Sequence, residues 1–488
     1  MLAASQMPSC VIIIFWSPSS EITKIGGMRS DTRIFTIFFV PILILGGASH
    51  AAMGEAAPLP AMTLSEALAY ARQYQPTLRA AQARLEVAKR AAATVRSEWL
   101  PQLGATAQVF YGTMNNSTAM YLGVKTLDLP RIGGSRTTSN WNDTYPSTVV
   151  GIGLRQNVYD FGRLAALAAA ADADAAVSRH EAEAESLDVG LQVESMFYAV
   201  LAAKAVERAA EDAYKRAALR RDMVKASVER GLRAPIDLTR AEADLTRFDV
   251  GRTRARGGIE AAQVMLAAAV GSPEPLLDTA GSVETEEALP PLGEALEQAL
   301  ERDPRLRAAL SRLAAQQALT RATQRQWAPS LALTASVSSR AGGAPIAGGP
   351  EGVSGWLPVV PNWDVGLVLS VPIFDGVLLA RRSQSQAMEE VLRQEVSVSR
   401  RRLLTDIQTA YTGFHIAEAT LPGLLSAATA AQKNYDQANA RFRAGLSTSV
   451  ELSDAETLRT DAEIQLAIGR FEVLRARSTF NRSIALGL

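Results

Sequence analysis

The sequence predicts a mainly α protein with some β structure, in which two copies of one plan each combine long helical hairpins with a pair of strands. Three observations predict this fold: an internal duplication, very long proline-poor helical tracts, and short stretches in which apolar residues alternate. Aromatic residues make up only 6% of the chain, so the helices are expected to pack through small side chains rather than around a thick core.

The duplication is visible as three blocks that each return 228 positions later. Residues 64–68, 75–78 and 99–103 correspond in this way to residues 292–296, 303–306 and 327–331. Later blocks return at an offset of about 215, such as 159–160 at 374–375, so the first copy contains the longer insert. A repeat of this length indicates a duplicated domain rather than a solenoid unit. We therefore expect one repeat over 62–271 and a second over 290–487.

Residues 1–52 are predicted to be an N-terminal extension and a secretory signal peptide. The segment from Met28 to Arg33 is basic, residues 34–45 form an apolar run, and residues 48–51 make a small-residue cleavage site. Met28 is a candidate start of translation. The alternative is a genuine anchor at the apolar residues 11–16, which is disfavoured because so short a run cannot cross about 30 Å of hydrocarbon.

The composition argues against several classes of function. Fifty basic residues balance fifty acidic ones, which disfavours a nucleic-acid partner held through phosphate contacts. Cys10 is the only cysteine and precedes the predicted cleavage site, so we expect no disulfide and no thiolate metal site. His180 and His415 fall at non-equivalent places in the two repeats, and we interpret both as helix-surface residues. We therefore expect no metal, no cofactor and no enzymatic activity.

Each repeat is predicted to open with one helix and to continue into two strands. The helix starts at Thr63, or after Pro290-Pro291, and ends at a Trp-x-Pro sequence. Apolar residues then alternate with small or polar ones over 103–111, 149–155, 331–338 and 363–371. Segments rich in Gly, Ser, Asn and Pro, 112–147 and 339–362, are predicted to be exposed loops between the strands.

The strands have one apolar face and one small or polar face. Tyr111, Trp327 and Trp363 lie near strand ends, where aromatic residues mark the two interfaces of a transmembrane β-barrel. The alternative is a soluble two-stranded flap on a helical body. Because four strands cannot close a barrel and an open edge in lipid leaves backbone groups unpaired, strands in a membrane would require an oligomer.

Long helices are predicted after each pair of strands, from Arg163 to about Glu229 and from Val377 to about Ala444. A tract of this length extends roughly 100 Å. Return helices are expected over about 236–270 and 450–486, and the first of them carries the spacing of a coiled-coil seam. That seam consists of Leu238, Ala241, Leu245 and Phe248, and Leu452 and Ala455 begin a similar one that Arg459 interrupts. Gly413 and Pro422-Gly423 predict a bend or local unwinding in the second long helix.

The turns between these helices have ordinary capping signals. Gly231 and Gly445 end the long helices, Pro235 suits the first turn of the next helix, and Thr448 with Glu451 has the spacing of a capping box. The geometry of a helical hairpin explains all of these residues without any function.

Taken together, these features resemble the TolC-type outer-membrane efflux proteins. The shared features are the duplicated plan, the Trp-x-Pro before each strand pair, the aromatic-Asp sequences at 159–160 and 374–375, and the Gly-Leu turns followed by an acidic residue and Leu. The resemblance covers residues 62–487. It implies a homotrimer whose twelve strands form one barrel in the outer membrane, continued into the periplasm by an α-helical barrel.

The function implied by this resemblance is a passive exit duct of a tripartite efflux or type I secretion system. Its partners would be a periplasmic adaptor and an inner-membrane transporter, and its cargo small molecules or polypeptides. The resemblance also places Gly231, Leu232, Gly445 and Leu446 at the adaptor contact.

The resemblance further assigns the periplasmic constriction to Glu451 and Asp454. Three chains would then contribute six carboxylates to one narrow ring, which would attract cations. Two departures from the family pattern are that Glu451 replaces the more usual aspartate and that the first repeat has Asp237 but Arg240. The alternative is that both acids only stabilise the N-terminus of their helix.

A different class of function is a periplasmic coiled-coil scaffold or adaptor without a membrane barrel. It would require the alternating strands to be soluble, and the sequence leaves no room for the compact β-domain that adaptors usually carry.

Overall fold

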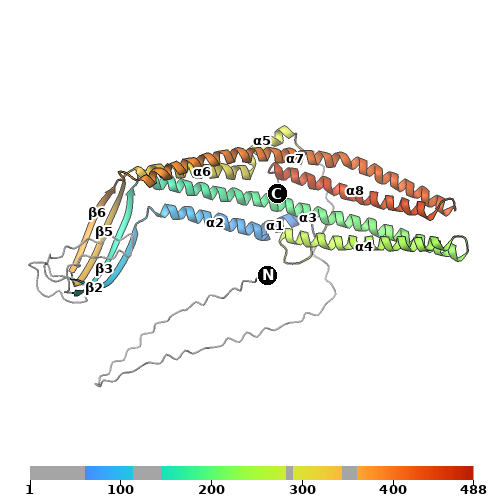
Figure 1. Cartoon of the computed structure of the whole chain (residues 1–488), viewed down its shortest axis with the longest axis horizontal. Helices are drawn as coiled ribbons and strands as arrows, with labels where there is room; N and C mark the ends of the chain where they lie inside the picture. Colours follow the sequence, from blue (N-terminus) through green and yellow to red (C-terminus); the bar gives the residue numbers. More distant parts are fainter. Residues whose placement is uncertain (1–60, 114–143, 282–288, 343–359, 487–488) are drawn as a thin grey trace, which may run out of the picture. The chain divides into compact units, whose positions relative to one another are not determined.

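The computed structural model describes residues 61–113, 144–281, 289–342 and 360–486, all within one compact unit of the chain (Figure 1). The predicted signal peptide over residues 1–52 lies outside the described residues. In chain order the described elements are β1 (Ala61–Met62), α1 (Leu64–Tyr74), α2 (Pro76–Ser97), β2 (Gln102–Thr113), β3 (Thr144–Tyr159), α3 (Arg163–Glu229), α4 (Pro235–Val270), β4 (Asp278–Thr279), α5 (Leu292–Arg302), α6 (Pro304–Gln324), η2 (Arg325–Trp327), β5 (Ser330–Gly342), β6 (Val360–Ser370), α7 (Gly376–Arg443) and α8 (Ser449–Ser483).

Each repeat opens with two helices, so the prediction of a single opening helix is wrong. The breaks fall at Gln75-Pro76 and at Asp303-Pro304. Proline has no backbone N–H and restricts the preceding residue to extended conformations, and Gln75 and Asp303 both have ψ of 121°. The predicted start at Thr63 is confirmed, because Thr63 and Glu66 form a reciprocal capping box.

The four long strands form one antiparallel sheet in the order β2-β3-β5-β6. The pairing of β3 with β5 joins the two repeats, and β2 and β6 are left as the edges. The strands are longer than predicted: β2 continues to Thr113 and β5 to Gly342, within segments that the sequence assigned to loops. Backbone pairing needs no apolar alternation, so these polar extensions carried no signal. The rest of both loops lies outside the described residues.

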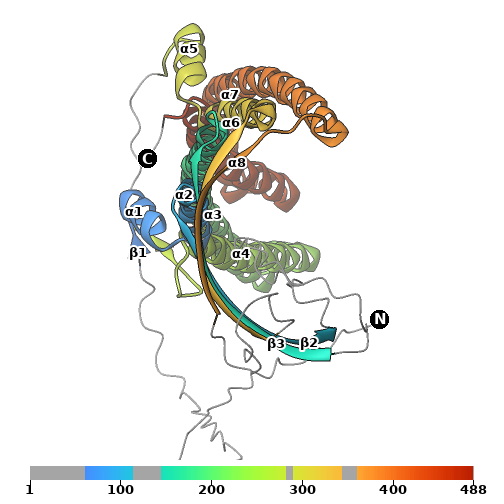
Figure 2. The same cartoon turned by 90° about the vertical axis from the view of Figure 1, so that its left-hand side faces the viewer.

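The two faces of the sheet differ as predicted. Leu103, Ile152, Val337 and Leu367 are exposed on the apolar face. The polar face carries Gly151, Gly153, Ser336 and Ser338, and these are buried. The Cβ atoms of a strand alternate, so the two sets of residues lie on opposite faces of the sheet. The polar face is the more enclosed one, as expected for the hollow side of a strongly curved sheet. Figure 2 shows the curvature of the strands.

The helices form one layer with two parts, one near the sheet and one away from it, and each part is four helices wide. Near the sheet the order of contacts is α2, α3, α6 and α7, and away from the sheet it is α4, α3, α8 and α7. The long helices α3 and α7 therefore run through both parts. Away from the sheet, α4 takes the place of α2 beside α3, and α8 takes the place of α6 between α3 and α7 (Figure 1). Figure 2 shows α1 and α5 outside the curve of the long helices.

Three clusters of buried apolar side chains hold this layer together. The largest joins α1, α3 and α4 around Phe197 and Leu266. The second joins α5, α7 and α8 around Ile407 and Phe480. The third lies close to the helical turns, where Val224, Ala241, Phe442 and Leu452 come from four different helices. By length and composition α3 could cross a membrane, and some of its apolar side chains, among them Val193 and Phe197, belong to the first cluster.

Two predictions about the long helices have different outcomes. The seam is confirmed at Ala241, Leu452 and Ala455, which are buried. α7 continues as a helix through Gly413 and Pro422, so of the predicted bend or local unwinding the unwinding does not occur.

Candidate functional site

The turn from α3 to α4 and the turn from α7 to α8 have the same geometry. Gly231 and Gly445 take left-handed conformations, with φ of 69° and 73°. The following residues, Leu232 and Leu446, donate their backbone N–H to the carbonyl oxygens five positions earlier, over 2.9 and 2.8 Å. This is the Schellman arrangement, which favours glycine because the left-handed region strains residues that carry a Cβ. Both leucine side chains point into solvent and are 75% and 72% exposed.

The predicted acidic pair lies just beyond the second turn. Glu451 and Asp454 are both exposed, and their spacing of three residues places them on one face of α8. Among the described residues, neither carboxylate takes part in an ion pair. Only half of the predicted capping box is present: the Thr448 hydroxyl accepts the Glu451 N–H over 3.3 Å. Glu451 therefore keeps its carboxylate free toward solvent.

Behind this exposed pair, polar contacts join the first helical hairpin to the second. The Ser449 hydroxyl donates to Asp237 over 2.7 Å, and the Ser453 hydroxyl donates to Asp244 over 2.6 Å. Asp244 also accepts a 2.7 Å hydrogen bond from Arg220, which is buried. Asp237, the first-repeat acid noted in the sequence, thus accepts a hydrogen bond instead of facing solvent alone.

Further from the turns, an ion pair crosses between the hairpins. Arg216 Nε lies 2.6 Å from the Glu456 carboxylate, which is almost wholly buried. Arg459, expected only to interrupt the seam, pairs with Glu463 over 2.8 Å and lies over the ring of Tyr435. Four residues of these contacts were not predicted from the sequence: Arg216, Arg220, Asp244 and Glu456. The available signal was the occurrence of charged residues beside seam positions, but the contacts that join the hairpins, such as Arg216 with Glu456 and Ser453 with Asp244, span more than 200 positions.

The predicted interface aromatics lie at different places. Trp363 is 74% exposed on the apolar face of β6, opposite Val337. Trp327 lies in the short helical turn before β5, is half-buried, and has no hydrogen-bond partner for its indole N–H among the described residues. Tyr111 is in β2 opposite Pro146, and its side chain lies outside the described part of the structure.

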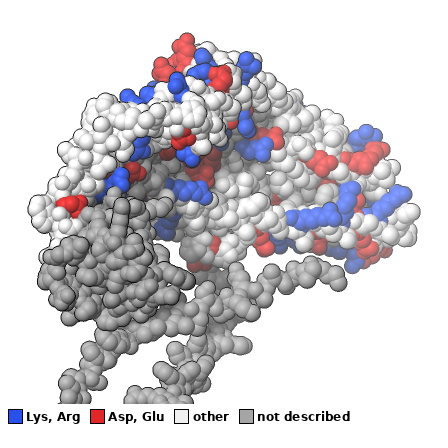
Figure 3. All heavy atoms as spheres, turned by 60° about the vertical axis from the view of Figure 1, so that its left-hand side comes forward, with Lys and Arg blue, Asp and Glu red and all other residues white. Residues whose placement is uncertain are grey.

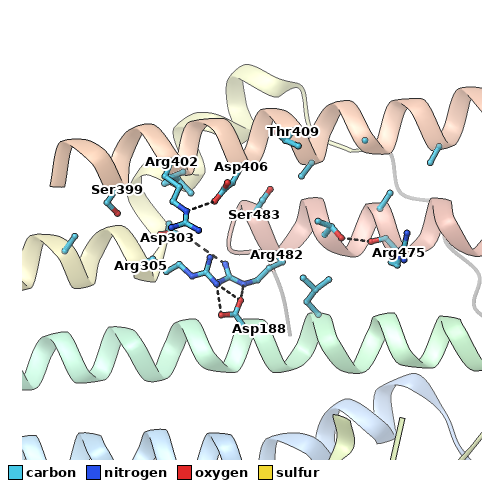
Figure 4. Close-up of a pocket in the computed structure, with 18 of the residues that line it drawn as sticks. Asp188, Asp303, Arg305, Ser399, Arg402, Asp406, Thr409, Arg475, Arg482 and Ser483 are labelled. Atoms are coloured by element: carbon cyan, nitrogen blue, oxygen red, sulfur yellow. Dashed lines mark hydrogen bonds and ion pairs between the residues drawn. The ribbon is translucent and has the colours of Figure 1, made fainter. Parts of the chain in front are cut away.

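A groove of about 1180 Å³ lies between α7 and the α6–α8 pair. At its base Asp188 of α3 accepts hydrogen bonds from Arg305 and Arg482, both at 2.7 Å (Figure 4). Arg402 and Asp406 pair across one turn of α7 above them. Acidic and basic residues alternate around this groove, so it has no strong preference for one sign of charge. The same interspersion is seen on the face drawn in Figure 3.

Partly or fully buried titratable groups occur where α3 packs against α8. Burial raises the pKa of the Glu194 carboxyl, and a hydrogen bond with Ser478 partly opposes this. Burial also raises the pKa of Tyr198, and the negative charge of Glu194 adds to the effect. Both groups lie in the middle of α3, away from the turns.

The histidines and acidic residues form no metal site within the described residues. His415 lies on the surface of α7, 3.2 Å from Glu418, as predicted for a surface residue. His180 is more enclosed than predicted, since only 15% of its side chain is exposed where it pairs with Glu183.

Comparison with known proteins identifies this architecture. The sequence profile of the outer membrane efflux protein family matches residues 67–272 and 295–485. The chain belongs to the outer membrane efflux protein family. No curated protein sequence matches the chain closely enough to count as a relative.

Solved structures of outer membrane efflux channels have the same fold. The outer-membrane channel OprN is 20% identical with a TM-score of 0.70, covering 87% of this chain and 90% of that one. The CmeC channel of Campylobacter jejuni is 16% identical with a TM-score of 0.71, covering 92% and 94%. The open state of the MtrE channel of Neisseria gonorrhoeae is 20% identical with a TM-score of 0.67, covering 86% and 88%.

Membership of this family confirms the resemblance, the fold class and the outer-membrane location predicted from the sequence. The protein is an outer-membrane efflux channel, a class that is not enzymatic and whose members work as trimers with periplasmic adaptors and inner-membrane transporters. The exposed apolar face of the sheet fits a membrane and not the soluble scaffold considered as an alternative.

Proposed function

We propose that Glu451 and Asp454 form the periplasmic constriction of a homotrimeric exit duct built from this chain. The observation that carries the proposal is that both carboxylates are exposed, share one face of α8 and lack an ion-pair partner in the described chain, whereas neighbouring Glu456 is buried and paired. In a trimer six carboxylates would converge at the turn end, and a ring of like charge focuses the electrostatic potential that attracts cations.

Recordings in planar lipid bilayers test this constriction. The double variant Glu451→Gln, Asp454→Asn keeps side-chain size and removes the charge, so we expect the cation preference of the resting pore to fall at least about twofold. Asp461→Asn is the matched control, because Asp461 is exposed on the same helix but farther from the turn. Equal selectivity in the wild type and the double variant, or an equal change in the control, would refute the assignment.

The two helical turns support a second part of the proposal, which is contact with a periplasmic adaptor. Gly231 and Gly445 fix the turns, and they present Leu232 and Leu446 as exposed apolar side chains at the end of the helical layer. Exposed leucines at a rigid turn suit a complementary apolar socket on a partner. The adaptor in turn would connect the duct to an inner-membrane transporter.

Crosslinking in cells tests the adaptor contact. Replacing Leu232 and Leu446 by Glu should abolish crosslinks to the adaptor while the trimer still forms. Leu219→Glu is the control, because Leu219 is 65% exposed on α3 but lies away from the turn. Crosslinks that persist in the Leu232 and Leu446 variant would show that the adaptor docks elsewhere.

We further propose that the repeats over 62–271 and 290–487 are the two structural units of the duct, and that Tyr111, Trp327 and Trp363 lie at membrane interfaces. Trp363 near the loop end of the sheet and Trp327 at its helical end occupy two different levels along the strands, as two interfaces require.

A further inference from the structure

A second polar site lies where the sheet meets the helices, at the opposite end of the helical layer from the turns (Figure 1). It is a cavity of about 550 Å³. The strand residues that line it are Gln102, Arg155, Asn157, Ser330 and Ser370. By the alternation of each strand, all five belong to the polar face that carries Thr106, Ser336 and Asp364. The cavity therefore opens on the hollow side of the curved sheet.

Three arginines from different elements line this cavity: Arg155 of β3, Arg163 of α3 and Arg325 at the end of α6. Arg155 is exposed and has no ion-pair or hydrogen-bond partner among the described residues. Arg325 is exposed, and its Nη1 donates to the Gly162 carbonyl oxygen over 2.8 Å, which fixes the guanidinium at the cavity wall. We call these three residues the arginine cluster.

The arginine cluster has little acidic compensation. Asp160 is the acidic residue lining the cavity, and it is only 3% exposed. Its two oxygens accept the backbone N–H groups of Gly162 and Leu164 over 3.1 and 2.7 Å, and Arg163 lies 3.8 Å away. Asp160 therefore caps the N-terminus of α3, and its carboxylate already has these partners.

A second acidic residue, Asp364, lies farther along the polar face and also has a hydrogen-bond partner. Its carboxylate accepts a hydrogen bond from the hydroxyl of Ser336, which lies opposite it on β5. Glu451 and Asp454 are at the other end of the long helices. An excess of positive charge thus remains at the cavity, in contrast to the balanced charges around the groove of Figure 4.

We propose that the arginine cluster is a binding site for oxyanion groups, carboxylate or phosphate, on solutes that leave through the channel. Guanidinium groups bind such anions through paired N–H donors, and Arg155 has its donors available. Three chains around the pore axis would repeat the cluster three times and form a positive girdle at the base of the barrel. The inference rests on the channel function but not on the constriction at Glu451 and Asp454.

Inorganic tripolyphosphate is a suitable probe, because it presents several oxyanion groups in a small volume. When the protein is added to one chamber of a planar bilayer, its large helical part remains on that side. Tripolyphosphate added to the other chamber reaches the arginine cluster without passing the turns. We expect a concentration-dependent block of the resting current that weakens as the ionic strength rises.

Variants at Arg155 separate this proposal from a nonspecific block. Arg155→Gln should raise the half-blocking concentration about five- to tenfold, since one charge-assisted contact is lost in each chain. Arg155→Lys keeps the charge but loses the paired donors, so it should raise the half-blocking concentration by less than Arg155→Gln does. Arg302→Gln, on exposed α5 outside the curve of the helices, should change nothing.

Isothermal titration calorimetry of the detergent-solubilised trimer with tripolyphosphate provides a measurement that does not depend on current. Binding should be detected for the wild type and the Lys variant and be weakened for the Gln variant. Equal block and equal binding for wild type and Arg155→Gln would overturn the proposal, as would a loss in Arg155→Lys as large as that in Arg155→Gln. Loss of the constriction phenotype at Glu451 and Asp454 would leave this result unaffected.

Discussion

The hydroxyl of Ser449 donates a 2.7 Å hydrogen bond to the carboxylate of Asp237. Ser449 is the first residue of α8, and Asp237 lies in the first turn of α4. The bond therefore joins the starts of the two return helices, directly behind the exposed acidic pair. Together with the contacts of Asp244, it makes the two hairpins of one chain a single unit at the turns.

The first prediction concerns Asp244, which accepts hydrogen bonds from both Arg220 and Ser453. Asp244→Ala should destabilise the folded trimer by about 2 kcal/mol, because Arg220 is buried and would lose its counter-charge. Thermal melting followed by circular dichroism measures the change. The double variant Arg220→Met, Asp244→Ala serves as the control, and it should recover part of the loss because no unpaired charge remains. A double variant less stable than Asp244→Ala would contradict this account.

The second prediction concerns Gly271, at the end of α4. Its φ is 77°, and an added Cβ would lie 2.9 Å from the Cα atom of Gln75. Gln75 in turn donates its side-chain amide to the Ala269 carbonyl oxygen over 2.8 Å. Gly271→Ala should therefore cost about 2 kcal/mol or more through strain and displacement of this junction.

Gly251→Ala is the matched control for Gly271, because Gly251 is inside α4 and nothing lies within 4 Å of its added Cβ. It should stabilise the helix by up to about 1 kcal/mol. The melting temperature is thus expected to fall for one alanine variant and to rise for the other. A shift in the same direction for both would argue against the strain at residue 271.

The third prediction is a pH dependence at Glu194, whose pKa is raised chiefly by burial. Because the folded state holds this proton more tightly than the unfolded state, the stability it contributes is present below the unfolded pKa and is lost as the pH rises through the folded value. Glu194→Gln should therefore be more stable than the wild type at pH 8, with the difference disappearing near pH 4.

Melting curves of the trimer at a series of pH values measure this effect. Glu98→Gln is the control, because Glu98 is exposed beyond the end of α2. A gain for Glu194→Gln that does not vary with pH would point to altered packing against Ser478 instead of a buried charge.

The fourth prediction contrasts the two faces of β6. Leu367 is 65% exposed on the apolar face, and Asn362 lies on the polar face of the same strand. Leu367→Lys should destabilise the barrel by about 2–4 kcal/mol, because the ammonium group would enter the hydrocarbon. Asn362→Lys should be tolerated. Urea titration of the protein refolded into lipid vesicles compares the two, and equal losses would reject the assignment of the faces.

Most of the fold could be predicted from the sequence because its signals are local. Alternation over residues 331–338 and 363–371 fixed which side of each strand faces the membrane, and glycines 231 and 445 fixed where the long helices end. The breaks at Gln75 and Asp303 were missed although proline follows each, because the apolar pattern continues across them.

The site was predictable only in part. The exposed residues Glu451, Asp454, Leu232 and Leu446 follow from their position beside a turn. The contacts behind them, such as Arg216 with Glu456 and Ser453 with Asp244, join positions 240 and 209 residues apart. No local pattern encodes such a pairing, because it depends on how four helices pack against one another.

The pairing of β3 with β5 has a consequence for how the channel arose. This contact sets the second strand of the first repeat against the first strand of the second repeat, and it leaves β2 and β6 as edges. In the twelve-stranded barrel of a trimer, β6 of one chain meets β2 of the next, which is a contact of the same kind. Fusion of two half-length genes would thus have turned three of six intermolecular seams into covalently linked ones. Assembly then requires three bodies to meet instead of six, so it proceeds at lower protein concentrations in the periplasm.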